Sequence, residues 1–327
     1  MSQQSRQDEI LMLFRQQPDA FVSGAEMSRV LGVSRTAVWK HIEQLRTLGY
    51  QIEAVTARGY RLRTSPDLLL PAELQTGLQT KVVGRELVYF TDTDSTNDRA
   101  HDLAKNGAEE GTVVIAESQQ AGKGRLGRRW TSPAGVNLYA SIILRPPIAP
   151  RYASQLTFLS SAAVARAIVD ITGLTPTVKW PNDVLLDGCK VAGLLNELDA
   201  ETERIRYLVL GVGVNVNMKA EQFPDDLRYP ASSLAIARGQ EVSRLLFTRT
   251  LLEHLDQLYD QYRREGFQPI LQAWQGFFAL TGRQVEVDCQ GRLLQGQVVG
   301  LDDDGALLLQ MADGRQERVL AGDVRPL

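Results

Sequence analysis

The stretch GTVVIAESQQAGKGRLGRRW, residues 111–130, decides between a dinucleotide-binding fold and a strand–loop–strand unit. A β-type apolar run leads into a loop, residues 122–130, that contains three glycines and four cations. This loop fits the G-x-G-x-x-G pattern, which in dinucleotide-binding folds also needs a helix opening on it and an acidic residue about 20 positions later. Here proline and glycine interrupt the next segment, a second β-type run follows, and no acidic residue occurs between Glu117 and Asp170. The sequence therefore predicts a strand–loop–strand unit.

The composition of this loop indicates that it binds an anion. Flexible glycines and fixed cations allow backbone N–H and guanidinium groups to converge on a phosphate or a carboxylate. An exposed nucleic-acid-binding patch is the alternative. The apolar strand after the loop and the indole of Trp130, which can cover an apolar ligand, favour a small-molecule anion.

Length and composition are those of an ordinary globular protein with two or three domains. The chain has 327 residues, of which 43% are hydrophobic and 23% are charged. No run of about 18 apolar residues and no signal-peptide organisation is present, so we expect no transmembrane helix and a cytoplasmic location. Cys189 and Cys289 share no metal-binding spacing and the three histidines are scattered, so the sequence assigns no metal site.

The first 64 residues combine helical patterns with a net positive charge. They contain nine Lys or Arg against six Asp or Glu, whereas the rest of the chain is acidic. Ser23 and Ser34 occupy N-cap positions of a second and a third helix, and Gly32 allows the tight turn between them. Two β-type runs around Arg58-Gly59 then form a wing. The pattern predicts a winged helix-turn-helix; a three-helix packing domain with solvated charges is the alternative.

The candidate DNA contacts lie at the N-terminal end of the third helix, which we expect to be exposed, and on the wing. They are Ser34, Arg35, Thr36, Trp39, Lys40, His41 and Arg58.

Two downstream segments place polar groups among β-type runs. In TVKWPNDVLLDGCKVAGLLNEL, residues 177–198, a predicted hairpin ends with Lys190 on a mostly apolar strand. A lone lysine there usually snorkels to solvent, but beside a cationic loop it becomes a candidate for stabilising negative charge. In YLVLGVGVNVNM, residues 207–218, small residues allow a ligand to approach the strand backbone closely.

Five motifs occur in an order that resembles the biotin–protein ligases. They are DSTN (94–97), ESQQAGKGRLGRRW (117–130), KWPND (179–183), CKVAGLL (189–195) and GVGVNVN (211–217). With a helix-turn-helix ahead of them, the chain is similar to the bifunctional bacterial members, which join a biotin ligase to a biotin operon repressor. The resemblance implies an α+β chain with a winged helix-turn-helix at 1–65, a mixed-sheet catalytic domain with helices at 66–278, and a small SH3-like β-barrel at 279–327.

The activity that this resemblance implies has two steps. ATP and biotin give biotinoyl-5′-AMP and pyrophosphate, and a lysine of the biotin carboxyl carrier protein then attacks the adenylate, with Mg²⁺ expected as the metal. Biotinoyl-AMP would act as the corepressor of a homodimer on biotin operator DNA, with no membrane partner. A metabolite-sensing transcription factor without ligase activity and a lipoate-type protein ligase are the alternatives.

The resemblance also implies roles for individual residues, with Lys190 and Arg125 as the catalytic pair. The implied biotin-binding residues are Ser95, Thr96, Asn97, Gln119, Gly122, Lys123, Gly124, Arg125, Trp130, Lys190, Gly193, Leu194 and Gly213. The implied ATP-binding residues are Arg125, Arg128, Lys179, Asn182, Asp183, Lys190 and Asn215. Lys123 stands where the family usually has arginine, and a lysine cannot make a bidentate contact with a carboxylate.

Overall fold

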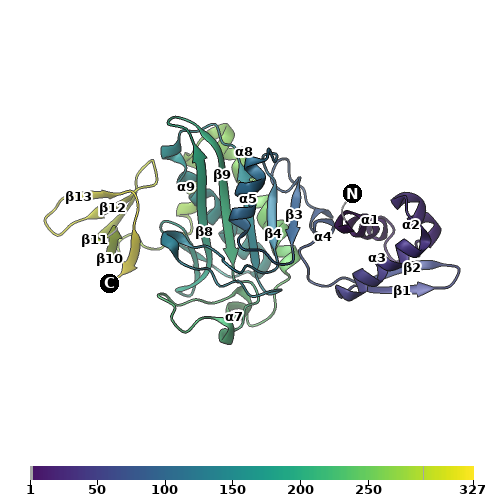
Figure 1. Cartoon of the computed structure of the whole chain (residues 1–327). Coiled ribbons are helices and arrows are strands. Elements are labelled where there is room, and N and C mark those ends of the chain that lie inside the picture. The colour runs from purple at the N-terminus through teal and green to yellow at the C-terminus, as the bar shows by residue number, and fades with distance from the viewer. Residues whose placement is uncertain (1–2, 290) are drawn as a thin grey trace. The chain divides into compact units, whose positions relative to one another are not determined.

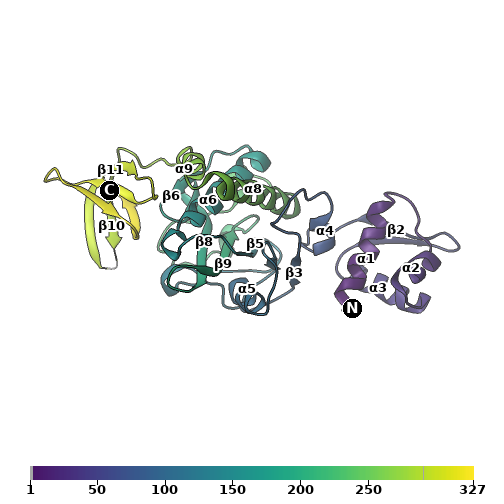
Figure 2. The same ribbon diagram turned by 90° about the horizontal axis from the view of Figure 1, so that it is seen from above.

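A computed structural model describes residues 3–289 and 291–327, and the chain divides into two compact units, one ending at Leu78 and one running from Gln79 to Leu327 (Figures 1 and 2). The elements of the N-terminal unit are α1 (Gln3–Gln16), α2 (Gly24–Leu31), α3 (Arg35–Thr47), β1 (Gln51–Val55), β2 (Gly59–Thr64) and α4 (Pro71–Gln75). β1 and β2 pair antiparallel, which forms the predicted wing.

Local contacts explain why α2 and α3 meet at a tight turn. The hydroxyl of Ser23 accepts a hydrogen bond from the Glu26 N–H at 3.1 Å, and that of Ser34 accepts one from the Ala37 N–H at 3.2 Å. Gly32 ends α2 with a φ of 63°, a conformation that glycine adopts without steric cost. The helix-turn-helix predicted from these three positions is therefore confirmed.

The short helix α4 packs against α1 within the N-terminal unit, although the sequence analysis placed its residues in the catalytic domain at 66–278. Glu73 in α4 is buried, and its carboxylate pairs with Arg15 of α1 at 2.6 Å. The hydroxyl of Tyr50 donates to the same carboxylate at 3.2 Å. A buried carboxylate needs such partners, and they explain why this unit continues past residue 65 to Leu78.

The second unit is built on a seven-stranded mixed sheet in the order β3-β4-β5-β9-β8-β7-β6. The strands are β3 (Leu87–Phe90), β4 (Val113–Ala116), β5 (Leu138–Leu144), β6 (Thr177–Lys179), β7 (Asp183–Leu186), β8 (Cys189–Ala200) and β9 (Ile205–Val214). β3 and β4 are parallel and the other pairs are antiparallel. Every residue of β4 and β5 is buried, because helices cover both faces of the sheet there.

The helices lie in two layers around this sheet. α5 (Thr96–Lys105) packs against β4, β5 and β9 on one face, and α6 (Gln155–Thr172) and α8 (Arg244–Glu265) pack together on the other (Figure 2). The remaining helices are α7 (Leu234–Arg238), α9 (Gln268–Gln275) and the 3₁₀ turns η1 (Arg125–Gly127), η2 (Pro150–Tyr152) and η3 (Ala220–Gln222). Among the described residues, no helix combines the length and apolar character needed to cross a membrane.

The C-terminal part of this unit is a five-stranded antiparallel sheet. Its strands are β10 (Gln284–Cys289), β11 (Arg292–Leu301), β12 (Leu307–Gln310), β13 (Gln316–Val319) and β14 (Asp323–Pro326), in the order β13-β12-β11-β10-β14. The prediction of a small β domain is confirmed. The SH3-like barrel is not confirmed, because within the described strands β13 and β14 at the two ends of this order do not pair.

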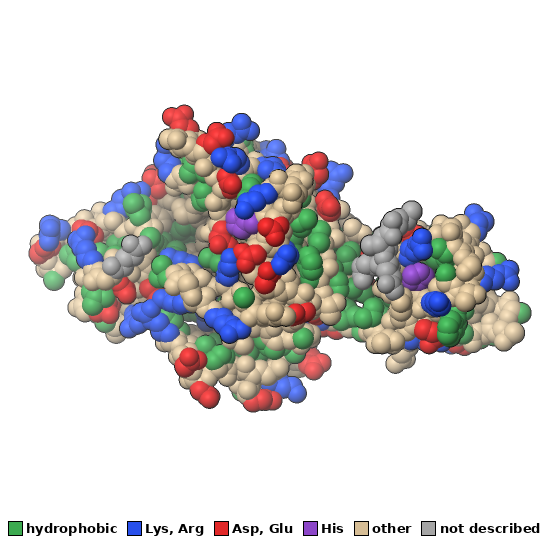
Figure 3. All heavy atoms as spheres, viewed as in Figure 1, with side chains coloured by type: hydrophobic (Ala, Val, Ile, Leu, Met, Phe, Trp, Pro, Cys, Tyr) green, Lys and Arg blue, Asp and Glu red, His purple; other side chains and the backbone are tan. Residues whose placement is uncertain are grey.

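On the face that Figure 3 shows, acidic and basic side chains lie interspersed, without a large area of one sign. The net positive charge of the first 64 residues therefore does not appear as one large positive area on this face.

Candidate active site

The glycine–arginine loop that follows β4 folds into a hairpin of its own. Lys123 and Arg129 form an antiparallel bridge, and the Gly124 N–H donates to the Arg128 carbonyl at 2.7 Å. At its tip Leu126 has a φ of 58°, which is uncommon for a residue with a branched side chain. The loop thus has a defined conformation, and its cationic side chains extend from a narrow turn.

The indole of Trp130 at the end of this hairpin lies directly on two glycines of the sheet. Gly193 of β8 and Gly213 of β9 are paired across the ladder. A Cβ atom on Gly213 would lie 2.7 Å from the indole, and one on Gly193 would lie 2.9 Å from it. The sequence predicts that these glycines let a ligand approach the strand backbone, and in the structure the Trp130 side chain occupies that space. Trp130 lies between two pockets and lines both.

The inner pocket, defined as the hollow of about 460 Å³ between α5, Trp130 and β9, is lined mainly by neutral groups, with Lys123, Arg125 and Lys190 as its charged members. Gln119 Oε1 accepts from the backbone N–H of Thr96 at 2.9 Å and from its hydroxyl at 3.1 Å. Gln119 Nε2 donates to the hydroxyl of Ser132 at 2.9 Å. Both ends of the Gln119 amide are therefore fixed by the protein.

A second fixed amide, that of Asn97, stands beside the first. Its Oδ1 accepts from the hydroxyl of Ser141 at 2.6 Å, and its Nδ2 donates to Glu197 Oε2 at 2.7 Å. Ser141 is 0% exposed, and Gly211 leaves the space that Asn97 Oδ1 fills. Buried polar groups that are satisfied in this way hold a single geometry.

The inner pocket brings together almost all residues predicted for biotin. Those that line it are Ser95, Thr96, Asn97, Gln119, Lys123, Gly124, Arg125, Trp130, Lys190, Gly193, Leu194 and Gly213. Gly122 does not line it, and the ammonium of Lys123 is engaged by Asp98 of α5. The sequence analysis assigned no role to Ala140, Leu195, Gly211 and Val212 in the wall or to Ser141 and Glu197 behind it, although Leu195, Gly211 and Val212 lie inside two of the quoted motifs.

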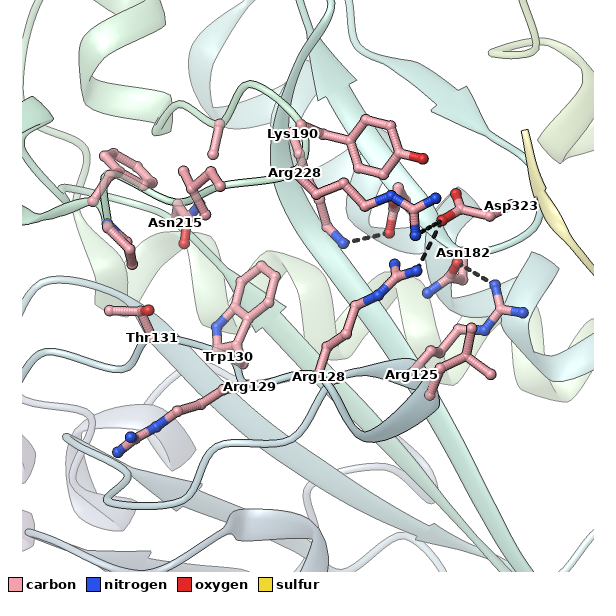
Figure 4. Close-up of a pocket in the computed structure, with 18 of the residues that line it drawn as sticks. Arg125, Arg128, Arg129, Trp130, Thr131, Asn182, Lys190, Asn215, Arg228 and Asp323 are labelled. Atoms are coloured by element: carbon pink, nitrogen blue, oxygen red, sulfur yellow. Dashed lines mark hydrogen bonds and ion pairs between the residues drawn. The ribbon is translucent and has the colours of Figure 1, made fainter. Parts of the chain in front are cut away.

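The outer pocket, defined as the hollow of about 990 Å³ on the other side of Trp130, is lined by charged side chains (Figure 4). Arg125 donates to Asn182 Oδ1 at 2.8 Å, and Lys190 Nζ lies 2.6 Å from Asp183 Oδ1. Burial lowers the pKa of Arg125, whose guanidinium nevertheless stays charged at neutral pH.

One carboxylate from the C-terminal sheet reaches the outer pocket. Asp323 Oδ2 lies 3.0 Å from Arg128 Nη2 and 3.4 Å from Arg228 Nη1, and its Oδ1 lies 3.5 Å from Lys179 Nζ. The ammonium of Lys179 also lies 3.8 Å from the ring centroid of Tyr229. No sequence motif predicted this contact between the last strand and the loop.

Six of the seven residues predicted for ATP line the outer pocket. They are Arg125, Arg128, Asn182, Asp183, Lys190 and Asn215. Lys179 does not line it, but its ammonium contacts two residues that do, Asp323 and Tyr229. Sequence reasoning missed Met218, Phe223, Pro224, Leu227, Arg228, Tyr229, Gly322 and Asp323, whose side chains converge only in the folded chain.

The predicted catalytic pair lies where the two pockets meet. Lys190 and Arg125 line both pockets, and so do Gly124, Trp130 and Asn182. Both Lys190 and Arg125 are only partly exposed. Two cations at the seam can neutralise charge that develops between a group held in one pocket and a group held in the other.

In the N-terminal unit the predicted DNA contacts are exposed with one exception. Ser34, Arg35, Thr36, Trp39, Lys40 and Arg58 are exposed. His41 is 8% exposed, so its prediction as an exposed DNA contact is wrong. The helical spacing explains the error, because His41 follows Val38 by one turn and shares its buried face with Ile42 and Leu45.

Metal-binding side chains are not gathered in the described parts of the chain. No group of three or more His, Cys, Asp or Glu side chains within residues 3–289 and 291–327 could hold a metal ion on its own.

The comparisons with known proteins agree with this architecture. Residues 88–215 match the Biotin/lipoate A/B protein ligase family, residues 6–61 match an HTH domain, and residues 281–325 match the Biotin protein ligase C terminal domain. The Biotin protein ligase from Aquifex aeolicus, solved in complex with biotin and ATP, has a TM-score of 0.64 and 27% sequence identity, and the match covers 74% of this chain and 99% of that one.

Two bacterial relatives extend the similarity to nearly the full length. The Bifunctional ligase/repressor BirA of Bacillus subtilis is 40% identical over 306 residues, which cover 94% of each chain. The protein of that name from Escherichia coli is 32% identical over 308 residues, which cover 93% of this chain and 92% of that one. With this identity and three matching domains, the chain belongs to the biotin–protein ligase family, among its bifunctional ligase/repressor members.

Proposed function

We propose that the chain activates biotin with ATP, transfers it to a lysine of a biotin carboxyl carrier protein, and represses transcription through its N-terminal unit. The observation that carries this proposal is the pair of adjoining pockets with Lys190 and Arg125 at their seam. A ligase of this kind needs to hold two substrates with their reacting groups in contact, and its chemistry is then largely a matter of positioning and electrostatics.

The inner pocket suits the uncharged head of biotin. The ureido group of biotin offers a carbonyl acceptor and two N–H donors, and the amides and hydroxyls of Asn97, Gln119, Thr96 and Ser95 supply matching partners. The glycines of β8 and β9 and the indole of Trp130 form an apolar surface for the remainder of the molecule. The valeryl carboxylate would then point toward the seam.

The outer pocket suits the nucleotide, because its cations match the triphosphate. In the first step a carboxylate oxygen of biotin attacks the α-phosphorus, a new O–P bond forms, and the bond to the β-phosphate breaks as pyrophosphate leaves with the electron pair. Lys190 and Arg125 would neutralise the charge that gathers on the phosphate oxygens. One such donor contributes roughly 3 kcal/mol in enzymes where it has been removed.

In the second step the amine of a carrier lysine attacks the acyl carbon of the adenylate. An amide bond forms, AMP leaves with the electron pair of the mixed anhydride, and the amine nitrogen loses its proton. Within the described residues around the pockets we identify no Ser/His/Asp or Cys/His nucleophilic set, and this reaction needs none.

A Mg²⁺ ion bound in the outer pocket would supply positive charge that offsets the charge of the phosphates. Mg²⁺ is commonly bound through one or two carboxylates together with substrate phosphates. Asp183 lines this pocket and would hold the ion; among the described residues, Lys190 is the ion-pair partner of its carboxylate, at 2.6 Å.

For the N-terminal unit we propose operator DNA as the partner, bound by a homodimer that forms when biotinoyl-AMP is present. Ser34, Arg35 and Lys40 are exposed on α3, and Arg58 is exposed on the wing. The guanidinium of Arg58 stacks 4.2 Å above the Phe21 ring, which preorganises it toward a phosphate.

Mass spectrometry of the carrier tests the ligase proposal. The protein is incubated with ATP, biotin and an apo carrier domain, and we expect one biotinyl group on one carrier lysine. Reactions without ATP, or with lipoate in place of biotin, serve as controls and should leave the carrier unmodified. An unmodified carrier in the complete reaction would refute the proposal, and lipoylation would reassign the acid.

A further inference from the structure

Asp323 connects four segments that are distant in the sequence. It lies at the start of β14, whose only described neighbour in the sheet is β10. Its carboxylate contacts Arg128 from the hairpin, Lys179 from β6 and Arg228 from the segment before α7. Figure 4 shows the guanidinium groups of Arg128 and Arg228 pointing toward it.

Burial makes this carboxylate dependent on its cations. The Asp323 side chain is 16% exposed and that of Lys179 is 11% exposed. Burial raises the pKa of Asp323, but Lys179 and Arg128 outweigh that effect and hold the pKa below its ordinary value. The group is therefore an anion at neutral pH, held where three positive side chains converge.

We propose that Asp323 is a stand-in anion, whose carboxylate takes the place among Arg128, Lys179 and Arg228 that the polyphosphate of ATP occupies when it binds. Asp323 then competes with the nucleotide for these cations. It also keeps them gathered while the pocket is empty, since three unpaired cations in one partly buried cluster would repel each other.

Two features of the outer pocket support a competitive role. Asp323 and Gly322 are the residues that the C-terminal sheet contributes to its wall, so the carboxylate lies inside the ligand space. Arg128 and Arg228 are about 40% exposed and therefore free to turn toward another anion. When the phosphates bind these cations, β14 loses its ion pairs to the hairpin, to β6 and to the segment before α7, which would couple nucleotide binding to the C-terminal sheet.

The test is the effect of Asp323→Asn on the KM for ATP in the full chain. Asn removes the charge and keeps the size, so the competing anion is lost. We expect the KM for ATP to fall about three- to tenfold, in the range for partly exposed ion pairs. We expect the KM for biotin to stay unchanged, and Asp323→Glu, which keeps the charge, to stay close to wild type.

A matched control distinguishes competition from a structural role. Asp313→Asn removes an exposed ion pair with Arg315 in the same sheet and should leave the KM for ATP unchanged. If Asp323 served only to attach the C-terminal sheet, Asp323→Asn would lower the thermal midpoint and leave the KM for ATP equal to or above that of wild type. An unchanged or raised KM for ATP would therefore overturn the proposal.

This inference rests on the proposed nucleotide site, and Arg128→Gln separates the two. If the site is correct, Arg128→Gln raises the KM for ATP, whatever the role of Asp323. A raised KM in Arg128→Gln together with an unchanged KM in Asp323→Asn would reject the stand-in anion alone. No effect of Arg128→Gln would reject the nucleotide site itself.

Discussion

The inner and outer pockets share a wall but are built by opposite means. The inner pocket fixes the amides of Asn97 and Gln119 through hydrogen bonds to hydroxyl groups, to one backbone N–H and to the Glu197 carboxylate. The outer pocket gathers cations around Asp323, and two of those cations are substantially exposed. A network of satisfied hydrogen bonds keeps one geometry, whereas exposed charges respond to salt and to competing ions.

The difference between the pockets follows from what each is proposed to bind. An uncharged ureido group gains its specificity from donors and acceptors at fixed positions, because an unmatched buried polar group is costly. A triphosphate carries its own strong charge, so cations can find it without being rigid. One sheet thus presents a rigid recognition site beside an adaptable electrostatic one. A substitution in one pocket should therefore change binding there and leave binding in the other pocket nearly unchanged.

The largest effect is expected where the two pockets meet. Lys190→Met removes the ammonium at the seam and keeps much of the side-chain volume. Because Lys190 would stabilise charge that develops in the reaction, we expect adenylate formation to slow about 100- to 1,000-fold. Pyrophosphate release in single-turnover reactions measures this step.

Lys105→Met is the matched control for this prediction, because Lys105 is an exposed lysine in the last turn of α5. It should leave the rate unchanged. If the Lys190→Met enzyme forms adenylate within fivefold of the wild-type rate, Lys190 takes no part in the chemical step.

The next effect should be confined to the inner pocket. A Cβ atom at position 211 would overlap Asn97 Oδ1, so Gly211→Ala must displace the amide from Ser141 and Glu197. We expect biotin binding to weaken about tenfold or more, as for the loss of buried hydrogen bonds, while ATP binding changes little. Isothermal titration calorimetry with each substrate measures both.

Gly276→Ala is the control glycine, since its added Cβ would lie at 3.4 Å from the nearest carbonyl oxygen without strain. It should bind biotin like the wild type. Equal losses of biotin and ATP binding in Gly211→Ala would show that the two pockets are not separable.

A smaller effect is expected from salt, and only in the outer pocket. Raising the ionic strength from about 0.05 M to about 0.5 M screens exposed charges. The KM for ATP should rise several-fold, while the dissociation constant for biotin should change less than about twofold. Potassium chloride and potassium acetate at equal ionic strength test whether the effect comes from screening or from a specific anion. An equal response of both substrates would contradict the contrast between the pockets.

The sequence predicted the residues that belong to motifs and missed those that act through the fold. Ser23, Gly32 and Ser34 identified the helix-turn-helix because caps and turns are local in sequence. Lys190 was found because a lysine on an apolar strand is unusual. His41 was placed on the wrong face because a short polar run does not show which side of α3 is covered.

The residues that were missed depend on contacts between distant segments. Asp323 lies 195 positions from Arg128, and nothing in the tail sequence indicates where the last strand ends in space. Arg228 lies in a segment without motif or periodicity. Ser141 is one small residue in an apolar strand, and its bond to Asn97 becomes visible only when α5 lies on the sheet.

The smallest effect is expected from His101, which stands behind the inner pocket. Its Nε2 lies 3.8 Å from Glu197 Oε2, and burial lowers its pKa from 6.5 although Glu197 acts in the opposite direction. The unfolded chain therefore takes up this proton more readily than the folded one. The stability that His101 contributes is present above pH 6.5 and is lost as the pH falls below it.

His101→Gln should remove this part of the acid sensitivity, because glutamine does not titrate. We expect the thermal midpoint to fall less in the variant than in the wild type between about pH 7.5 and about pH 5.5. The lowered pKa of Asp323 keeps its carboxylate charged over this pH range. We therefore expect His101→Gln to leave the KM for ATP close to that of the wild type. A variant that loses as much stability on acidification as the wild type would show that His101 takes no part, and it would leave the carboxylates as the source of any acid sensitivity.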